Sequence, residues 1–299
     1  MGSNFNKIFK LLSKVTTAKK NVSLTTLTSF KIGGTAKVVV EPNNLEQIIK
    51  VMDILNTYKA KYMVVGNGTN LLVEEYDGVI VKLANNFSKV SITSNVIIAE
   101  AGASLNKVAI LARDNGLSGM EGLFGIPATV GGATLMNAGA FGVQMSDIVT
   151  SVLAITNGKI THYNLQECGF GYRKSIFADS IILRVEFTLK QGDTDKIAVA
   201  MTTNMQHRVN SQPLNYPSAG CVFANGEGYY AGKLIDEHGL KGYKVGGAMI
   251  SPKHANFIVN MGNATFGDVI QLIHYVTDYF KSKNINLNTE LKIIHKEKQ

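Results

Sequence analysis

Hydrophobic and polar positions along the chain predict a mixture of short strands and amphipathic helices. Short apolar runs predict strands at 36–40, 62–65, 71–73, 96–101, 181–189, 257–260 and 290–295. Apolar positions three and four residues apart predict helices at 44–52, 104–115, 197–208 and 229–238, and a long one after 265. Strands and helices do not alternate regularly, so the pattern predicts an α+β fold and not a doubly wound dinucleotide fold.

Local signals mark where several of these elements begin and end. Asn44, Ser104 and Thr265 each stand just before an apolar-periodic segment, where their side chains can cap a helix. Asn157-Gly158 lies between two apolar runs, 152–156 and 160–163, and predicts a two-residue β-hairpin. Residues 211–220 contain two of the five prolines and are expected to link a third region to the rest.

Composition indicates an ordinary globular protein with more than one domain. The chain has 299 residues, of which 45% are hydrophobic and 17% charged. No apolar run reaches the roughly 18 residues that a membrane-spanning helix needs. Two cysteines, Cys168 and Cys221, form no disulfide framework, which suits a reducing compartment. We therefore expect a cytoplasmic protein that does not insert into membranes.

The net charge of +8 favours acidic small-molecule ligands over nucleic acid. Only four of the 30 basic residues are arginine, and the lysines are scattered. Arginine is the residue that base and phosphate recognition usually requires. The basic, arginine-free segment at 5–15 is amphipathic, and we expect a plain N-terminal helix packed on the body and not a transit peptide.

A glycine-dense stretch at 121–142 is the strongest candidate for ligand binding. Glycine lets the backbone approach a ligand closely, and successive backbone N–H groups can hold an anion without a cationic side chain. A second such loop, at 66–70, follows a predicted strand. Neither loop matches a P-loop or the G-x-G-x-x-G pattern. A tight Gly/Ala packing loop with no ligand is the alternative for the first stretch.

Three side chains outside the loops have chemistry that a site could use. Arg173 follows a tyrosine and can hold a carboxylate, Cys221 follows a flexible turn, and Glu290 precedes the last apolar run. On local grounds an exposed arginine, a small buried thiol and a solvated glutamate are the simpler interpretations. The six histidines form no cluster, so we expect no metal. No G-x-S-x-G is present, although a hydrolase is not excluded by that alone. The residues by themselves favour nucleotide or dinucleotide binding and leave the reaction open.

Six ordered motifs resemble one enzyme family. They are TSFKIGG at 28–34, VVGNGTNLLV at 64–73, GIPATVGGATLMNAGAFG at 125–142, GYRKSIF at 171–177, PSAGCVF at 217–223 and TELKII at 289–294. Together they resemble the UDP-N-acetylenolpyruvoylglucosamine reductases, and the absence of an inserted segment before residue 290 is similar to the shorter, type II branch. The resemblance spans nearly the whole chain.

The resemblance implies a two-part FAD-binding region of the vanillyl-alcohol-oxidase (PCMH) type and a C-terminal α+β substrate-binding domain. The expected boundaries are 1–83 for the first FAD-binding subdomain, 84–210 for the second and 211–289 for the substrate-binding domain. The strand at 290–299 is expected to return to the first subdomain. The residues that the resemblance assigns to non-covalent FAD binding are Gly66, Asn67, Gly68, Thr69, Asn70, Gly125, Ile126, Pro127, Thr129, Gly131, Gly132, Asn137, Ala138, Gly139, Ala140 and Gly142.

The implied reaction transfers a hydride from NADPH through FAD to the enolpyruvyl ether of a UDP-sugar, followed by protonation of the α-carbon. Arg173 and Glu290 match the family's catalytic arginine and late glutamate, which stabilise the developing enediolate. Cys221 stands where the family usually has a serine as proton donor. A thiol with a pKa of about 8.5 is still mostly protonated at neutral pH, so the substitution is chemically permissive. We therefore expect Cys221 to keep the role.

Weaker parts of the resemblance concern substrate contacts. They assign the substrate to Tyr172, Asn225, Lys233 and His254. Ala224 replaces a lysine that often follows the cysteine motif, so that contact is missing or supplied elsewhere. We also expect a monomer that binds no nucleic acid. The alternatives are another FAD-dependent oxidoreductase of the same superfamily and a non-catalytic flavin- or nucleotide-binding module, which would not need Arg173, Cys221 and Glu290 to act together.

Overall fold

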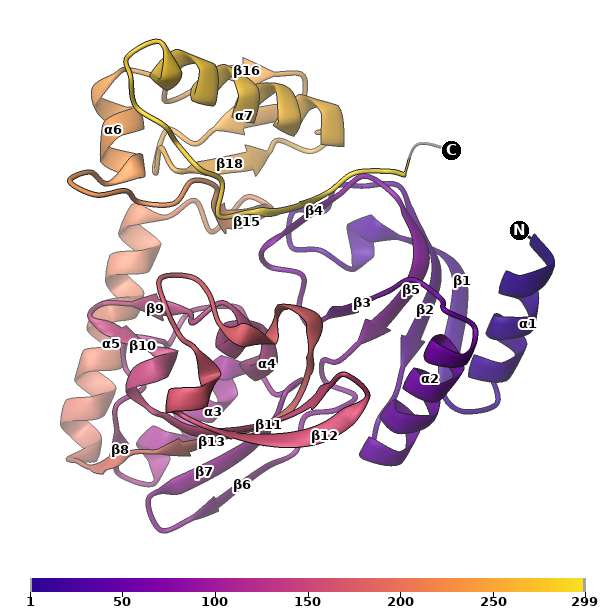
Figure 1. Cartoon of the computed structure of the whole chain (residues 1–299). Helices are drawn as coiled ribbons and strands as arrows, with labels where there is room; N and C mark the ends of the chain where they lie inside the picture. Colours follow the sequence, from indigo (N-terminus) through magenta and orange to yellow (C-terminus); the bar gives the residue numbers. More distant parts are fainter. Residues whose placement is uncertain (1, 298–299) are drawn as a thin grey trace. The chain divides into compact units, whose positions relative to one another are not determined.

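The computed structural model of the chain describes residues 2–297, so Met1 of the predicted first subdomain and residues 298–299 of the predicted returning strand lie outside the described residues. The chain divides into two compact units that are interleaved in sequence. The first unit comprises residues 1–19, 38–67 and 78–207, and the second comprises 20–37, 68–77 and 208–299. Figure 1 shows the helices and strands of the chain, coloured along the sequence.

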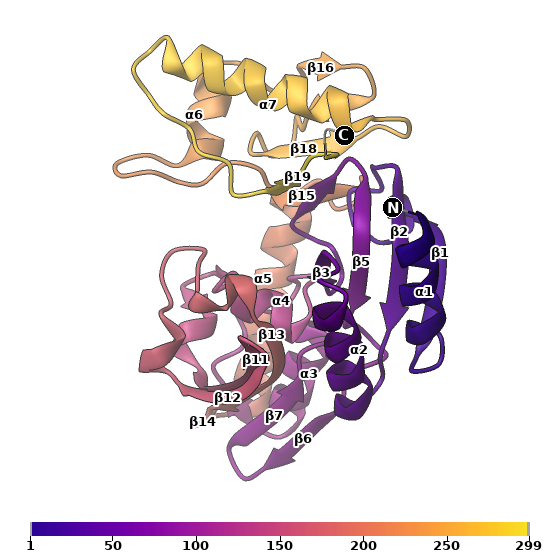
Figure 2. The same ribbon diagram turned by 45° about the vertical axis from the view of Figure 1, so that its right-hand side comes forward.

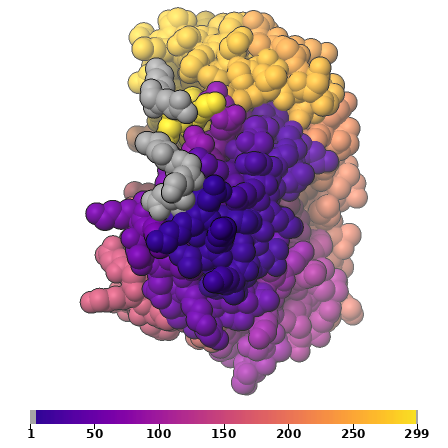
Figure 3. Space-filling model, turned by 90° about the vertical axis from the view of Figure 1, so that its right-hand side faces the viewer, coloured from indigo at the N-terminus to yellow at the C-terminus, as the bar shows by residue number. Residues whose placement is uncertain are grey.

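The first unit contains most of a four-stranded sheet, with strand order β1-β2-β5-β3. Its strands are β1 (Thr17–Ser23), β2 (Thr35–Glu41), β5 (Tyr76–Lys82) and β3 (Tyr62–Val65). Helices α1 (Gly2–Leu12) and α2 (Leu45–Thr57) lie next to each other beside this sheet (Figure 2). Ile8 and Leu12 of α1 are buried in the same core as Val51 and Leu55 of α2. The prediction of a packed N-terminal helix is confirmed, and Figure 3 shows its indigo outer surface.

The rest of the first unit is built on a five-stranded antiparallel sheet of order β12-β11-β13-β7-β6. Its strands are β6 (Val90–Thr93), β7 (Val96–Glu100), β11 (Val149–Thr156), β12 (Lys159–Asn164) and β13 (Ile181–Thr188). The predicted hairpin joins β11 to β12, with Asn157 at φ 51° and Gly158 at φ 74°, as a type I′ turn requires. One face of this sheet packs against α3 (Leu105–Asp114) and α4 (Val130–Leu135).

Short elements complete the first unit. β8 (Leu117–Ser118) pairs with β14 (Lys190–Gln191), and β9 (Gly139–Ala140) pairs with β10 (Val143–Gln144). Single 3₁₀ turns lie at η2 (Met145–Asp147), η3 (Gln166–Cys168) and η4 (Ile176–Asp179). The long helix α5 (Thr194–Ser211) begins in this unit and ends in the second.

The second unit has its own antiparallel sheet, of order β15-β18-β17-β16. The strands are β15 (Ser218–Cys221), β16 (Lys244–Val245), β17 (Ala248–Ile250) and β18 (Phe257–Asn260), and the helices are α6 (Ala231–Glu237) and α7 (Phe266–Lys281). β19 (Lys292–Ile294) pairs in parallel with β4 (Leu71–Val73), which brings the end of the chain beside an N-terminal segment of the same unit. Phe30 and Ile32, just after η1 (Leu24–Thr26), pack into this unit's core.

Most predicted helix ends are confirmed by their capping bonds. The Asn44 side chain accepts from the backbone N–H of Gln47, and Thr265 forms a reciprocal capping box with Asp268. Ser104 also stands in extended conformation before α3, but its side chain makes no capping hydrogen bond. The last strand is shorter than predicted, because β19 begins at Lys292, so Glu290 lies in the connection before it.

The sequence predicted a loop over residues 121–142, but the structure has helix α4 at Val130–Leu135 within it. Two glycines in a six-residue helix oppose helix formation by propensity alone. Packing explains why it forms: Thr129 caps it by accepting from Gly132, and a Cβ added to Gly131 would lie 2.8 Å from the Cβ of Ala101. The glycine at 131 therefore allows α4 to lie directly against the sheet. Among residues 2–297, no helix has both the length and the apolar character needed to cross a bilayer.

Candidate functional site

The two predicted glycine loops meet within the first unit. The Asn67 side chain donates a hydrogen bond of 3.0 Å to the carbonyl of Pro127. A Cβ added to Gly66 would lie 2.3 Å from Oγ1 of Thr129, so only glycine permits this approach. Segments 60 residues apart in sequence are thus held against one another at the start of α4.

Several backbone N–H groups of the glycine-rich stretch are used inside the protein. Those of Gly125, Gly131 and Gly132 donate to the Asn106 side chain, the Ala101 carbonyl and the Thr129 hydroxyl, respectively. Asn137 and Ala138 donate to the carbonyls of Thr134 and Ala133. These five N–H groups therefore build the wall, and the anion nest proposed from glycine content does not extend to them.

The residues present fit a flavin dinucleotide on two observations. The first is the close approach at Gly66, where Thr129 fills the place of a side chain and the two loops form one continuous wall. The second is charge: Glu121 is the one acid in 121–142, and its carboxylate accepts from the Ser118 hydroxyl at 2.7 Å and the Gly119 N–H at 2.8 Å. The single negative charge of the stretch is thus already hydrogen-bonded, which limits its repulsion of a diphosphate.

Arg173 lies against the same stretch in a strained backbone conformation. Its φ is 52°, in the left-handed region that residues other than glycine rarely adopt. It belongs to a tight turn in which Gly171 and Lys174 exchange two backbone hydrogen bonds. Its guanidinium donates to the carbonyl of Gly139 at 3.1 Å and to that of Asn137 at 3.5 Å. The ring of exposed Tyr172 lies 5.3 Å from its guanidinium carbon.

The side chain of Asn137 is hydrogen-bonded to the turn that carries Arg173. Its side chain is 2% exposed, donates to the carbonyl of Gly171 at 3.0 Å and accepts from the N–H of Ser146 at 2.9 Å. It also has a positive φ, of 40°. The family resemblance assigned Asn137 to the cofactor, and the structure shows that its carboxamide joins three backbone segments.

In the second unit, Cys221 ends strand β15 and is half-buried. The segment after it is clamped by the buried residue Asn256, whose side chain accepts from the N–H of Phe223 and donates to its carbonyl, both at 2.8 Å. The backbone carbonyl of Asn256 accepts from the N–H of Val222, also at 2.8 Å. Sequence reasoning missed Asn256, because no local pattern marks a side chain that pairs with a segment 33 residues away.

Glu290 is brought to the same segment. Its N–H donates to the carbonyl of Val222 at 2.8 Å, one residue from Cys221. Its own carbonyl accepts from the side chain of Asn70 at 3.2 Å. Asn70, expected at the cofactor, is therefore tied to Glu290, and nearby the carbonyl of Gly68 accepts from the N–H of Ser29 at 3.2 Å. Two of the three predicted catalytic residues thus lie together in the second unit, and Arg173 lies in the first.

Arg208 is a further charged residue near Cys221 that sequence reasoning did not single out. It lies near the C-terminal end of α5 and is 6% exposed. Burial lowers the pKa of its guanidinium, and its interaction with Cys221 acts in the opposite direction. A cation at this position favours the thiolate form of a cysteine. The sequence offered only a weak signal, an arginine at the end of an amphipathic helix before the proline-containing segment.

The predicted substrate residues of the second unit lie at and around α6. Asn225 accepts from the N–H of Ala231 at 3.0 Å and so fixes the start of that helix. Lys233 is exposed on α6 and forms a 3.7 Å ion pair with Glu237. His254 lies against the helix, since a Cβ on Gly232 would be 3.2 Å from its ring.

No metal centre is evident in the part of the chain that the structure describes, where no three His, Cys, Asp or Glu side chains group to hold an ion. Neither Cys168 nor Cys221 forms a disulfide. Cys168 is buried and donates to the carbonyl of Asn164 at 3.2 Å. Burial, followed by the charge of Glu167, raises the pKa of Cys168 to about 11, so this thiol stays protonated.

Comparison with known proteins places this geometry in a family. A model described as an FAD binding domain matches residues 36–164, and one described as the UDP-N-acetylenolpyruvoylglucosamine reductase C-terminal domain matches 212–294. A UDP-N-acetylenolpyruvoylglucosamine reductase of Caldanaerobacter subterraneus subsp. tengcongensis is 45% identical over 273 residues, covering 89% of this chain and 90% of that one. The chain belongs to the UDP-N-acetylenolpyruvoylglucosamine reductase family.

Other members of the family agree over nearly the full length. The reductase of Clostridium novyi is 41% identical and covers 94% of this chain and 93% of its own. The crystal structure of the reductase from Thermus caldophilus has a TM-score of 0.81 and 36% identity, covering 93% of this chain and 99% of that one. The predicted family and α+β fold class, with an FAD-binding region and a C-terminal domain, are confirmed.

The environment of His254 generates a prediction about pH. Burial, and next the charge of Lys241, lower its pKa against the opposing effects of a backbone hydrogen bond and of Asp236. Its Nδ1 accepts from the N–H of Asn256 at 3.3 Å, which requires the neutral ring. The unfolded chain then binds a proton more readily, so His254 contributes stability above its unfolded pKa of about 6.5 and loses it as pH falls below that value.

We expect the free energy of unfolding to fall between about pH 7 and pH 5, and to fall less in His254→Gln. Urea unfolding followed by circular dichroism across this range measures it. His162→Gln, on the outer strand β12, is the control and should keep the wild-type slope. An unchanged slope in His254→Gln would contradict the prediction.

Proposed function

We propose that this protein is an FAD-dependent reductase that uses NADPH to convert UDP-N-acetylglucosamine enolpyruvate to UDP-N-acetylmuramate in peptidoglycan precursor synthesis. The observation that carries the proposal is the anchoring of Arg173 on the carbonyls of Asn137 and Gly139. These two carbonyls belong to the region that matches the FAD binding domain model. An arginine fixed on the glycine-rich stretch supports the binding of a substrate carboxylate beside the flavin.

In this proposal the chain's own residues bind and protonate the substrate. Bound FAD supplies the relay that moves a hydride from NADPH to the β-carbon of the enol ether. The double bond then places negative charge toward the α-carbon and its carboxylate, and the Arg173 guanidinium stabilises that charge. The α-carbon takes its proton from Cys221, so one hydride and one proton add across the double bond while NADPH becomes NADP⁺.

Cys221 is suited to the role of acid by what lies near it. A thiol is a stronger acid than a hydroxyl, and the positive charge of Arg208 would stabilise the thiolate left after proton transfer. Glu290 is held beside the same segment through the carbonyl of Val222. We propose that its carboxyl group, together with Arg173, polarises the developing enediolate.

The remaining assignments follow from the family. We propose the boundaries 1–83, 84–210 and 211–289 for two FAD-binding subdomains and a substrate-binding domain, with 290–299 returning to the first. Tyr172, Asn225, Lys233 and His254 are the proposed contacts to the UDP-sugar, and the glycine-loop residues named above are proposed to surround FAD. We further propose a monomeric, cytoplasmic enzyme.

The assay that tests this function is NADPH oxidation by the FAD-loaded protein with and without the enol ether substrate. We expect oxidation that depends on the enol ether, with one UDP-N-acetylmuramate formed per NADPH. Oxidation that needs oxygen and ignores the enol ether would instead indicate another flavin oxidoreductase. Flavin binding without any NADPH oxidation would indicate a non-catalytic module.

Cys221→Ala should lower turnover by about 10² to 10⁴, the usual contribution of a general acid, while NADPH still reduces the enzyme-bound flavin. Cys221→Ser should keep substantial turnover, because a hydroxyl can occupy the same position and donate a proton. Stopped-flow absorbance separates the NADPH half-reaction from the substrate half-reaction. Cys168→Ala, which removes the other thiol, is the control, and normal turnover by the Cys221→Ala enzyme would exclude Cys221 as the acid.

Asn137→Ala should slow the substrate half-reaction by about 10- to 100-fold, an effect of roughly 1.4–2.7 kcal/mol on the barrier, because the Arg173 turn loses its support. FAD content and the NADPH half-reaction should change less than the substrate half-reaction, because the carboxamide of Asn137 is bonded to the backbone of Gly171 and Ser146, and its proposed contact with FAD is left to its backbone. The same stopped-flow experiment measures both steps. Asn95→Ala, which also removes an amide-to-carbonyl hydrogen bond from the first unit, is the matched control. Equal losses in both variants, or in both half-reactions, would show that Asn137 acts only on stability.

A further inference from the structure

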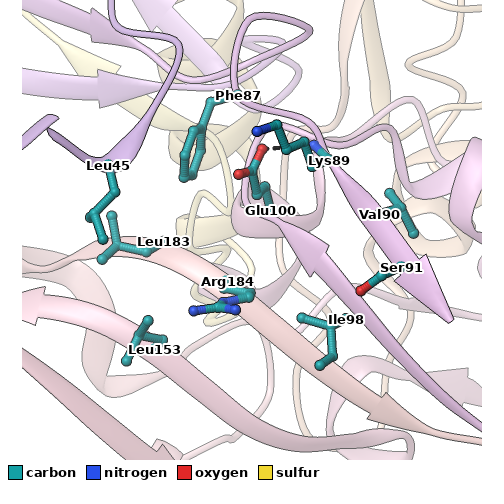
Figure 4. A pocket seen from close by; sticks show the side chains of 10 residues that line it. All are labelled: Leu45, Phe87, Lys89, Val90, Ser91, Ile98, Glu100, Leu153, Leu183 and Arg184. Atoms are coloured by element: carbon teal, nitrogen blue, oxygen red, sulfur yellow. Dashed lines mark hydrogen bonds between the residues drawn. The ribbon is translucent and has the colours of Figure 1, made fainter. Parts of the chain in front are cut away.

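The five-stranded sheet of the first unit has a hollow of about 550 Å³ on one face. Leu45, Phe87, Leu153 and Leu183 form apolar parts of its lining, and Lys89, Glu100 and Arg184 supply its charges. Figure 4 shows the Arg184 guanidinium near the middle of the lining residues, with Leu45 and Phe87 toward one side. The volume lies in the range typical of small-molecule pockets.

The hollow lies on the face of the sheet turned away from the glycine-rich stretch. Val152, Ala154 and Val185 of the sheet are buried in the core with Val130 and Ala133 of α4. Successive residues of a strand point to opposite faces of the sheet. Leu153, between Val152 and Ala154, and Ile98 on β7 therefore point to the other face and line the hollow. The proposed flavin loops and this hollow are therefore separated by the sheet itself.

A β-bulge brings Arg184 into the hollow. Leu153 pairs with Arg184, but the next residue, Ala154, pairs with Ile182, so Leu183 is an extra residue on β13. Ile182 is buried in the core on the other face, whereas Leu183 and Arg184 both line the hollow. Bulges re-aim side chains and are frequent next to binding sites. Without this extra residue, Leu183 and Arg184 would face opposite sides of the sheet.

The two cations of the hollow have no partner among residues 2–297. Neither the Lys89 ammonium nor the Arg184 guanidinium forms an ion pair or side-chain hydrogen bond there, although Arg184 and Glu100 are cross-strand partners. Glu100 accepts instead from the backbone N–H of Lys89 at 2.7 Å. The hollow thus combines an apolar surface with two unpaired positive charges and one carboxylate already in use.

We propose that this hollow binds a small amphiphilic anion, a carboxylate with an alkyl chain of medium length. Its head group is held by Arg184 and Lys89, since arginine pairs with carboxylates through two parallel N–H donors. Its alkyl chain lies along Leu45, Ile98 and Leu153, which are partly exposed, so binding removes apolar surface from water. The proposal is independent of the reductase function, because none of these residues belongs to the proposed flavin or substrate contacts.

The chain contains no tryptophan, which permits a specific reporter at the hollow. Leu153→Trp places a single indole on its half-buried apolar side. Titration of the FAD-loaded Leu153→Trp protein with decanoate, below its micelle concentration, should give a saturable change in indole emission. Adding Arg184→Gln should weaken binding at least tenfold, and Lys89→Gln should weaken it in the same direction.

Controls separate this site from nonspecific binding. Arg113→Gln, which removes an exposed arginine paired with Asp114, should leave decanoate binding unchanged. Decanol, which has the same chain and no charge, should bind at least tenfold more weakly. NMR of carboxyl-¹³C decanoate with the unmodified holoprotein provides a measurement free of the Trp substitution, and the shifted resonance should be lost in Arg184→Gln.

Equal binding of decanol and decanoate, or undiminished binding by Arg184→Gln, would overturn the proposal. A response to anionic phospholipid vesicles with none to free decanoate would also overturn it, in favour of a membrane surface. NADPH oxidation by Arg184→Gln should remain at the wild-type rate, so failure of the reductase assignment and failure of this site are distinguishable.

Discussion

The loops that carry the proposed chemistry depend on buried asparagine side chains. Irregular backbone packed inside a protein has N–H and C=O groups with no ladder partner, and each unpaired group is costly. A carboxamide can donate and accept at once, so a single asparagine can satisfy both kinds of group. Asn256 does this for both polar groups of Phe223, and Asn137 does it across Gly171 and Ser146. Asn260 likewise accepts from Gly262 and donates to Phe30.

These clamps explain how strained backbone persists where chemistry is proposed. Arg173 and Asn137 both have φ in the left-handed region, which costs roughly 1–2 kcal/mol for a residue with a Cβ. The strain is maintained because the surroundings specify the geometry several times over: Asn137 holds Gly171, and Arg173 in turn holds the carbonyl of Gly139. The arginine head group is therefore placed by backbone carbonyls on a rigid wall, with little freedom to follow the exposed turn on which it sits.

The sequence predicted most of the longer helices and the hairpin, because periodicity and caps act locally, but it missed strands β1, β5 and β6. Asn44, Thr265 and the Asn157-Gly158 hairpin needed only their own neighbours. Helix α4 was missed because its two glycines oppose helix formation, and only contact with Ala101, some 30 residues earlier in the chain, explains it. The same limit applies to the bulge at Leu183, since a register shift is a property of paired strands and leaves no mark in one of them.

Some residues of the candidate site could be identified from the sequence, and others only from their contacts in the structure. Arg173, Cys221 and Glu290 could be named because ordered motifs resemble a family, whereas their composition and spacing supported only bland interpretations. Asn256 and Arg208 could not be identified from the sequence, because only their contacts in the folded chain link them to the segment of Cys221. Asn70 and Asn137 were named for the cofactor, yet the structure gives each a bond to the segment of a proposed catalytic residue. Resemblance identified the positions, and only the three-dimensional contacts suggest how they act.

The two thiols show why position decides function for chemically identical groups. Cys168 is buried beside Glu167, and both burial and that negative charge raise its pKa to about 11. A thiol in that state neither donates a proton readily nor reacts. Cys221 is half-buried and interacts with the cationic Arg208, while Asn256 and Glu290 fix the backbone that follows it. A positive charge near a thiol favours the thiolate, so the surroundings of Cys221, unlike those of Cys168, support its proposed role as the acid.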